Sequence, residues 1–255
     1  MKRRSFVIVG LLSVAVAAYG DLQMHVRRLV RAESAATISS AKSLRGKNRR
    51  VSEAAGSISD DPVSFRDRAA LRAEISRRSD GTYISDVLTD RDSALIRWPD
   101  RREKPLRVWI QPTSDVADWN SDFVQQARVA FTEWSATGIP VYFTFVSDSA
   151  HADVHLTWVD HFDETVSGKT LWARDGRYWM VDADIILATH HSSGESLDAS
   201  AIRALALHEV GHLLGLDHTA DVTTIMTPRV RVRELTAADR ATVRLLYSLP
   251  PGSLR

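Results

Sequence analysis

The sequence has 255 residues and contains no cysteine. Disulfide bonds are therefore excluded, and the chain must fold on its hydrophobic core alone. A domain of this size can bury enough apolar surface to do so without covalent cross-links. The lack of cysteine is compatible with a protein outside the cytoplasm, although it does not by itself indicate that compartment.

An excess of charge of either sign is also absent. Lys and Arg number 33 and Asp and Glu number 32, which gives a formal net charge of +1. We therefore expect no nucleic-acid partner, although residues 27–50 are locally basic. Residues 32–60 are rich in Ser, Ala and Gly and have few aromatic side chains. This composition predicts a disordered linker, and the pattern of residues 63–78 then predicts one short amphipathic helix.

The apolar run near the N-terminus is too short for a typical membrane span. It extends over 14 residues, from Phe6 to Tyr19, and follows Lys2-Arg3-Arg4. A span needs about 20 residues, so this length suits the core of a signal peptide better. Residues 1–20 are predicted to be a signal peptide or a signal anchor, which would tether the protein to a membrane through residues 6–19. Either alternative predicts an extracytoplasmic protein that is secreted, periplasmic or membrane-anchored.

Three histidines and one glutamate stand at fixed spacing in residues 208–218. His208 and His212 are four residues apart, so on a helix both imidazoles lie on one face, where they can bind one Zn²⁺ at about 2.0–2.1 Å. If the helix continued to His218, that residue would lie roughly 15 Å from His208 along the axis. We therefore predict that the helix ends at Gly215, because glycine adopts the left-handed conformation that terminates helices.

The full pattern H-E-x-x-H-x-x-G-x-x-H is similar to the signature of the metzincin clan of zinc endopeptidases. Those enzymes carry a methionine turn beneath the metal, and Met226 stands in such a position shortly after His218. The Gly-Leu-Asp run before His218, the short gap to Met226 and a final helix after Leu235 most resemble the matrixin branch. Within that final helix, Thr236 and Asp239 independently predict a capping box.

The resemblance implies a site and a reaction. His208, His212 and His218 would hold one catalytic Zn²⁺, and Met226 would form the floor of the site without binding the metal. Zinc would lower the pKa of a water in its fourth position toward about 7 and polarise the scissile carbonyl. Glu209 would take the proton from this water as general base and later give it to the leaving amine. The expected function is a zinc-dependent endopeptidase that hydrolyses protein or peptide substrates.

An alternative of another class is a catalytically inactive zinc-fold module that binds peptides at the cell envelope. The presence of Glu209 argues against it, because loss of the base would be the first sign of such a change. A further role of residues 21–100 as a membrane-anchored scaffold is left open.

The order of the elements indicates an α+β fold that is zincin-like or metzincin-like. We predict a small mixed twisted sheet with an active-site helix, a Met-turn and a C-terminal helix, over residues 104–250. Residues 21–103 are predicted to be a linker or pro-like region that is partly disordered. Strands are predicted at 106–110, 141–146, 153–159, 171–173 and 183–187, and an amphipathic helix at 120–137 with Asn120 as its cap.

The resemblance also implies that Leu171, Trp172 and Ala173 form the sheet edge along which an extended peptide substrate lies. Packing of Trp172 as an ordinary edge residue is the alternative. Trp172 and Asp184 stand where many matrixins have histidines of a second, structural zinc site, so we do not assign that site, and calcium is left open. The Pro228-Arg229-Val230 run replaces the Pro-x-Tyr run of the family's substrate pocket, so this pocket is expected to differ.

Overall fold

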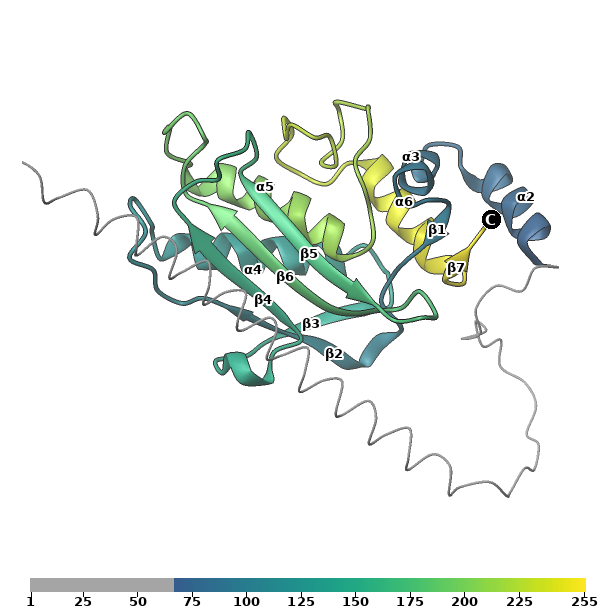
Figure 1. The fold of residues 1–255 in the computed structure, drawn as a ribbon, viewed down its shortest axis with the longest axis horizontal. Coiled ribbons are helices and arrows are strands. Elements are labelled where there is room, and N and C mark those ends of the chain that lie inside the picture. Colours follow the sequence, from purple (N-terminus) through teal and green to yellow (C-terminus); the bar gives the residue numbers. More distant parts are fainter. Residues whose placement is uncertain (1–66) are drawn as a thin grey trace, which may run out of the picture. The chain divides into compact units, whose positions relative to one another are not determined.

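The computed structural model of the protein describes residues 67–255 (Figure 1). The predicted signal peptide or anchor at residues 1–20 and the predicted linker at residues 32–60 lie outside the described residues. Within residues 67–255, no helix is both long enough and apolar enough to cross a membrane.

Five strands form one mixed sheet in the order β3-β2-β4-β6-β5 (Figure 1). They are β2 (Arg101–Ile110), β3 (Val141–Phe145), β4 (Val154–Val159), β5 (Gly168–Arg174) and β6 (Met180–Ala188), with a short 3₁₀ helix, Ser149–His151, before β4. Strand β5 runs antiparallel to β6, whereas the other neighbouring pairs are parallel. A tight turn allows this reversal, because the side chain of Asp175 accepts hydrogen bonds from the backbone of Arg177 and Trp179. The predicted small mixed sheet is confirmed, and β5 is one of its two edges.

Helices α4 (Asp122–Ser135) and α5 (Ala199–Leu213) lie side by side against one face of the sheet (Figure 1). The stripe of apolar residues predicted for α4 is its buried face, and Trp134 at its end is fully buried. The indole Nε1 of Trp134 donates to the carbonyl of Leu207 at 2.8 Å, which fixes α4 against α5. The helix begins two residues later than predicted, with Ser121 at the cap, while Asn120 accepts a hydrogen bond from the backbone of Asp122.

Helix α5 ends where the sequence predicted. Its last residue is Leu213, and Gly215 has a φ of +101°, which only glycine adopts without strain. A side chain at Gly215 would also overlap the carbonyl oxygen of Ile96. Glycine is therefore required here for a second reason. The indole of Trp98 donates to the Leu213 carbonyl at 2.8 Å and satisfies one of the free carbonyls at the helix end.

Helix α6 (Ala237–Ser248) begins at the predicted capping box. Thr236 accepts from the backbone of Asp239, and Asp239 accepts from the backbone of Thr236. The carboxylate of Asp239 is fully buried and has two further donors, the backbone of Ile225 at 3.2 Å and the hydroxyl of Tyr83 at 2.9 Å. This cap therefore joins three separate parts of the chain.

The described residues before the main sheet are folded into the same core. They form α2 (Asp67–Arg78), α3 (Ile84–Asp90) and β1 (Ala94–Leu95), and β1 pairs with the C-terminal strand β7 (Gly252–Ser253). Helix α2 falls where the sequence predicted a short helix. The predicted boundary between residues 103 and 104 lies inside β2, so the folded unit begins at or before residue 67 rather than at residue 104. The sequence missed this because helices α2 and α3 contribute only a few buried apolar residues each.

We predict that a chain starting at residue 100 does not fold stably, whereas one starting at residue 67 does. Residues 67–99 bury seven large apolar side chains that would be lost: Leu71, Ile75, Ile84, Val87, Leu95, Ile96 and Trp98. Each contributes about 1.5–3 kcal/mol when buried, and their sum is comparable to the total stability of about 5–15 kcal/mol of a typical domain. Near-ultraviolet circular dichroism and thermal unfolding would check this. Equal unfolding temperatures for the two chains would contradict it.

Candidate metal centre and cleft

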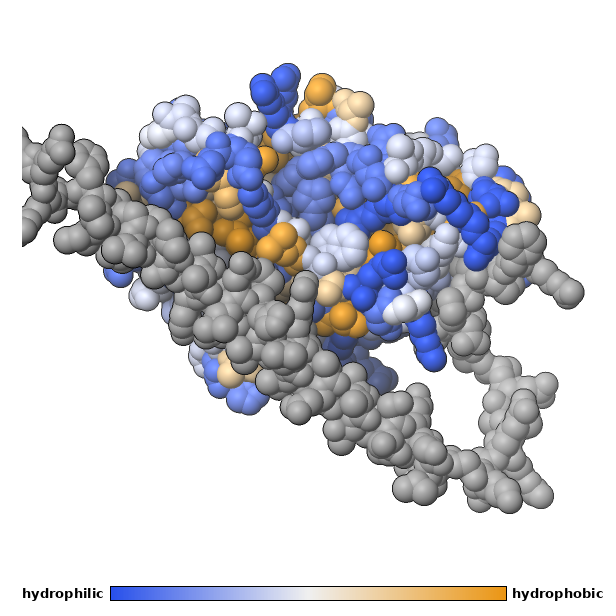
Figure 2. Space-filling model, viewed as in Figure 1, coloured by the Kyte–Doolittle hydropathy of each residue, from blue (hydrophilic) through white to orange (hydrophobic). Residues whose placement is uncertain are grey.

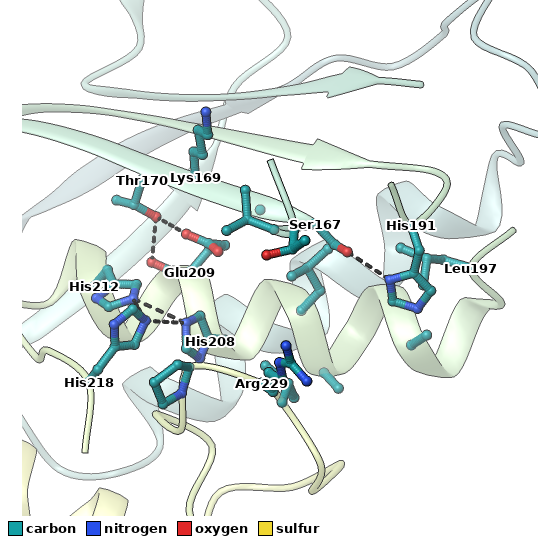
Figure 3. Close-up of a pocket in the computed structure, with 18 of the residues that line it drawn as sticks. Ser167, Lys169, Thr170, His191, Leu197, His208, Glu209, His212, His218 and Arg229 are labelled. Carbon is teal, nitrogen blue, oxygen red and sulfur yellow. Dashed lines mark hydrogen bonds between the residues drawn. The ribbon is translucent and has the colours of Figure 1, made fainter. Parts of the chain in front are cut away.

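Three imidazole nitrogens meet at the C-terminal end of α5. His208 and His212 project from one face of the helix, and His218 comes from the loop that turns back after Gly215 (Figure 3). The Nε2 atoms are 3.1 Å apart between His208 and His212, 3.2 Å between His212 and His218, and 3.3 Å between His208 and His218. Within residues 67–255, these histidines are the one group of three or more His or carboxylate side chains arranged to hold a metal ion.

The hydrogen bonds of the other ring nitrogens show which form of the imidazoles is present. Nδ1 of His208 lies 2.7 Å from the carbonyl oxygen of Ile225, and Nδ1 of His212 lies 3.2 Å from that of Leu216. A carbonyl oxygen only accepts, so Nδ1 carries the proton in each ring and Nε2 presents its lone pair. Burial lowers the pKa of His208 to about 4 and also lowers the pKa of His212, so both imidazoles are neutral near pH 7. Neutral imidazole is the form that binds metals.

The three facing nitrogens fit a tetrahedral zinc ion. Lone pairs that face one another at 3.1–3.3 Å repel unless a cation lies between them. Three nitrogens bound tetrahedrally at about 2.0–2.1 Å lie about 3.3 Å from one another, which agrees with the observed spacing. Residues 67–255 place three imidazoles there and no fourth ligand side chain, which is also typical of catalytic zinc sites that keep one position open.

Glu209 lies between the metal ligands and the edge strand. Its carboxylate Oε2 accepts a hydrogen bond of 2.6 Å from the hydroxyl of Thr170, which also donates to the Glu209 backbone carbonyl at 3.0 Å (Figure 3). The other carboxylate oxygen lies against Gly168, where any side chain would overlap it. The side chain is almost fully buried, and burial raises the pKa of Glu209 to about 7, whereas the hydrogen bond from Thr170 lowers the pKa. A cation on the histidines would lower the pKa further by its charge.

Met226 lies beneath the metal ligands and is fully buried. Its sulfur occupies the space that a side chain at Gly211 would need, one residue before His212, and the ring of Trp134 lies 3.3 Å from the same position. The preceding residue, Ile225, supplies the carbonyl that orients His208. The Met-turn therefore packs against α5 at Gly211, between His208 and His212.

The cleft beside the histidines has a volume of about 840 Å³ and runs between β5 and α5. Leu171 is 44% exposed, and Trp172 is partly buried with its ring 4.4 Å from the guanidinium of Arg91. The two alternatives for Trp172, packing as an edge residue and lining the substrate edge, do not exclude each other. Its ring packs against Arg91 and also lines the cleft. Arg229 and Val230 form part of the far wall. In the same view as Figure 1, the surface over β5 and α5 shows hydrophobic patches among hydrophilic residues (Figure 2).

The other histidines of the described chain contact carboxylates or hydroxyls instead. His155 lies 3.2 Å from Asp184, and His161 lies 2.7 Å from Asp160. His190 lies 3.0 Å from both Asp118 and Asp160. Thr170 and Gly168 were not found from the sequence. The alternation of a strand places residues 168, 170 and 172 on one face, but neither residue type points to a role beside a carboxylate.

The comparison with protein families agrees with the geometry. The model of the matrixin family of peptidases matches residues 100–248, which include the three histidines, Glu209 and Met226. This is more than half of the chain. The protein belongs to the matrixin family, and the resemblance noted in the sequence is confirmed.

Three plant proteins named as metalloendoproteinases are similar to this chain. Metalloendoproteinase 1-MMP of Arabidopsis thaliana is 34% identical over 137 residues, which are 49% of this chain and 37% of that protein. Metalloendoproteinase 1 of Glycine max is 27% identical over 141 residues, 48% of this chain and 44% of that protein. Metalloendoproteinase 4-MMP of Arabidopsis thaliana is 27% identical over 163 residues, 59% and 45% respectively. The chain thus matches less than half of the length of each relative.

We predict that the purified protein, refolded with Zn²⁺, holds one zinc ion per chain. His218→Ala should release most of it, because two imidazoles alone leave the tetrahedral site half empty. His161→Ala is the matched control, since His161 is exposed and contacts only Asp160 among the described groups. Elemental analysis after dialysis would measure the metal. Zinc-free protein after refolding with the metal would refute the assignment of the site.

Gly211→Ala tests the contact between the Met-turn and α5. In an ordinary helix interior this change stabilises by about 1 kcal/mol, but here the new methyl group would overlap the Met226 sulfur. We expect a loss of about 1–3 kcal/mol in the free energy of unfolding, as for other overpacked cores. Gly176→Ala, at a glycine with open space around it, should be nearly neutral. Denaturant unfolding would compare the two, and a Gly211→Ala variant more stable than the parent would exclude the contact.

Proposed function

We propose that the protein is a zinc-dependent endopeptidase that uses Glu209 as general base. The observation that carries the proposal is the convergence of three Nε2 atoms at 3.1–3.3 Å beside a buried carboxylate at the floor of a cleft. Membership of the matrixin family and similarity to plant proteins named as metalloendoproteinases support the same activity.

His208, His212 and His218 would hold the zinc ion, with their Nδ1–H groups fixed by backbone carbonyls for at least the first two. Bound there, zinc supplies Lewis-acid polarisation of the scissile carbonyl and lowers the pKa of a water molecule. Every proton transfer then falls to Glu209, whose Oε atoms take the proton of the attacking water and later deliver it to the amine that leaves.

The surroundings of Glu209 suit this task. A general base works best when its pKa lies near the working pH, and burial raises the pKa of Glu209 to about 7. Thr170 holds one carboxylate oxygen by a hydrogen bond of 2.6 Å, so the base is fixed in direction before a substrate arrives. Gly168 leaves room for the other oxygen.

We further propose that an extended peptide binds along Leu171, Trp172 and Ala173. Within residues 67–255, strand β5 pairs with β6 alone, so the backbone N–H and C=O groups of its other side can pair with a peptide that adds as another strand. The cleft follows this edge past Glu209 and the histidines. Arg229 and Val230 replace the usual tyrosine wall, and Arg233 also lines the cleft.

We propose that the protein acts outside the cytoplasm, secreted, periplasmic or membrane-anchored. The support is the sequence of residues 1–20, whose basic start and 14-residue apolar run suit a signal peptide or a signal anchor. An inactive zinc-fold peptide-binding module at the cell envelope is not favoured, because Glu209 is present and held by Thr170.

Glu209→Gln separates a peptidase from a peptide-binding module. Gln keeps the shape and the contact with Thr170 but cannot take a proton, so we expect zinc content to stay the same and the rate of cleavage of a denatured protein substrate to fall by about 10²–10⁴. Glu74→Gln, at an exposed glutamate on α2, should retain the rate of the parent. A Glu209→Gln variant as fast as the parent would remove Glu209 from the mechanism, and a parent that holds zinc yet cleaves nothing would overturn the proposed activity.

A further inference from the structure

Arg91 lies between α3 and β1, before the first residue that the matrixin family model matches. It is buried, and its guanidinium contacts the loop that carries His218. We propose that Arg91 is a positioning residue for two of the three metal ligands, so that a segment outside the matched region forms part of the metal centre. This inference rests on the proposed zinc site and goes beyond it.

One contact connects Arg91 with the second ligand. Nη2 of Arg91 donates to the carbonyl oxygen of Leu216 at 3.0 Å, and the same oxygen lies 3.2 Å from Nδ1 of His212. A carbonyl oxygen has two lone pairs and can accept both donors. Arg91 therefore fixes the direction of the acceptor that orients the His212 ring, and outer groups of this kind keep a ligand in its binding orientation.

A second contact connects Arg91 with the third ligand. Nε of Arg91 donates to Oδ2 of Asp217 at 3.0 Å, and Oδ1 of the same carboxylate accepts a hydrogen bond of 2.9 Å from the backbone N–H of His218. Asp217 thus bridges the guanidinium and the backbone of the ligand. The Arg91 side chain is only 3% exposed and that of Asp217 is 24% exposed, so the guanidinium is shielded from water while the carboxylate is partly open to it.

The geometry requires arginine rather than any cation. Two donors of one rigid planar group satisfy two acceptors on neighbouring residues, Leu216 and Asp217, which the single ammonium of lysine cannot match in direction. The flat face of the group also lies over the ring of Trp172 on strand β5, with 4.4 Å between the guanidinium carbon and the ring centre. Arg91 therefore links the ligand loop to the edge strand across one end of the cleft.

Arg91 is itself held in place by its own segment. Arg91 is the C-terminal cap of α3, and its backbone N–H donates to the carbonyl of Val87 within that helix. The next two residues, Asp92 and Ser93, have φ of 55° and 59°, which turn the chain sharply into β1. Helix α3 makes a second contact with the ligand loop, since Asp86 accepts a hydrogen bond of 2.6 Å from the Thr219 hydroxyl. The guanidinium thus comes from a backbone that is anchored on both sides.

Arg97 offers a matched control. It is also buried, and its guanidinium lies 4.7 Å from the ring centre of Trp179. It donates twice to the carbonyl of Leu249, at 3.0 and 2.9 Å, and once to the carbonyl of Trp98 at 3.1 Å. Leu249 directly follows α6, and its backbone N–H donates to Leu246 within that helix. Arg91→Met and Arg97→Met therefore remove comparable buried guanidinium groups. The first group donates directly to Leu216 and Asp217 beside the histidines, whereas the second donates to the carbonyls of Leu249 and Trp98.

The experiment measures the zinc dissociation constant of the full chain by competition with a chelator of known affinity, for the parent, Arg91→Met, Arg91→Lys and Arg97→Met. We expect Arg91→Met to weaken zinc binding about 10–100-fold, as loss of outer-shell partners does in other zinc sites. The zinc affinity of Arg91→Lys should lie between those of Arg91→Met and the parent, because lysine keeps the positive charge but loses the two fixed donors of the planar guanidinium. Arg97→Met should bind zinc as the parent does.

The visible spectrum of the Co²⁺-loaded proteins should change for Arg91→Met and not for Arg97→Met, because it reports ligand geometry.

Thermal unfolding of the zinc-free proteins separates positioning from plain stability. If Arg91→Met does not fold, Arg91→Lys takes its place in the comparison. Zinc affinity within about twofold of the parent for the folded Arg91 variant, or equal losses for the Arg91 and Arg97 variants, would overturn the inference. Since the readout is zinc affinity, a chain that binds zinc but cleaves no peptide would refute the proposed function alone.

Discussion

The central constraint of this structure is that three imidazole nitrogens must meet at 3.1–3.3 Å although the third histidine follows the first by ten residues. A continuous helix cannot satisfy this spacing, so α5 must end directly after His212 and the chain must turn back. Gly215, with φ of +101° and the Ile96 carbonyl against it, makes the turn. Trp98, which donates to the Leu213 carbonyl, and Leu246, which packs against Gly215, hold that reversal in place.

Hydrogen bonds between buried polar groups fix much of the loop that follows this turn. Asp239 accepts from Thr236, from the backbone of Ile225 and from Tyr83, and Ile225 in turn accepts from His208. The start of α6 is thereby connected to the first ligand through two hydrogen bonds. Leaving any buried partner unsatisfied costs about 1–3 kcal/mol, so the network fixes the loop from Met226 to α6 more firmly than apolar packing alone would.

The sequence predicted the features that depend on local spacing. The pair His208 and His212, the helix end at Gly215 and the capping box of α6 each follow from a few neighbouring residues, and the structure has all of them. The contacts that depend on tertiary packing were missed. Arg91 and Asp217 are 126 residues apart, and nothing in the sequence around Arg91 marks it among the chain's many basic residues. The start of the folded unit was missed for the same reason, because residues 67–99 are recognisable as part of the core only through what they contact.

Strand β5 contacts the site through its inward-facing residues and borders the cleft with its backbone. Its residues Gly168, Thr170 and Trp172 lie against the carboxylate of Glu209 and the guanidinium of Arg91, while its outer backbone groups pair with no other strand of residues 67–255. A peptide that pairs with this backbone would restrict the motion of the strand, and the restriction would reach the base and the ligand loop through the same three residues. If a peptide binds along β5 as proposed, occupancy of the cleft and order around the three histidines would be thermodynamically linked, and a longer peptide that pairs with more of the strand would meet a more rigid site.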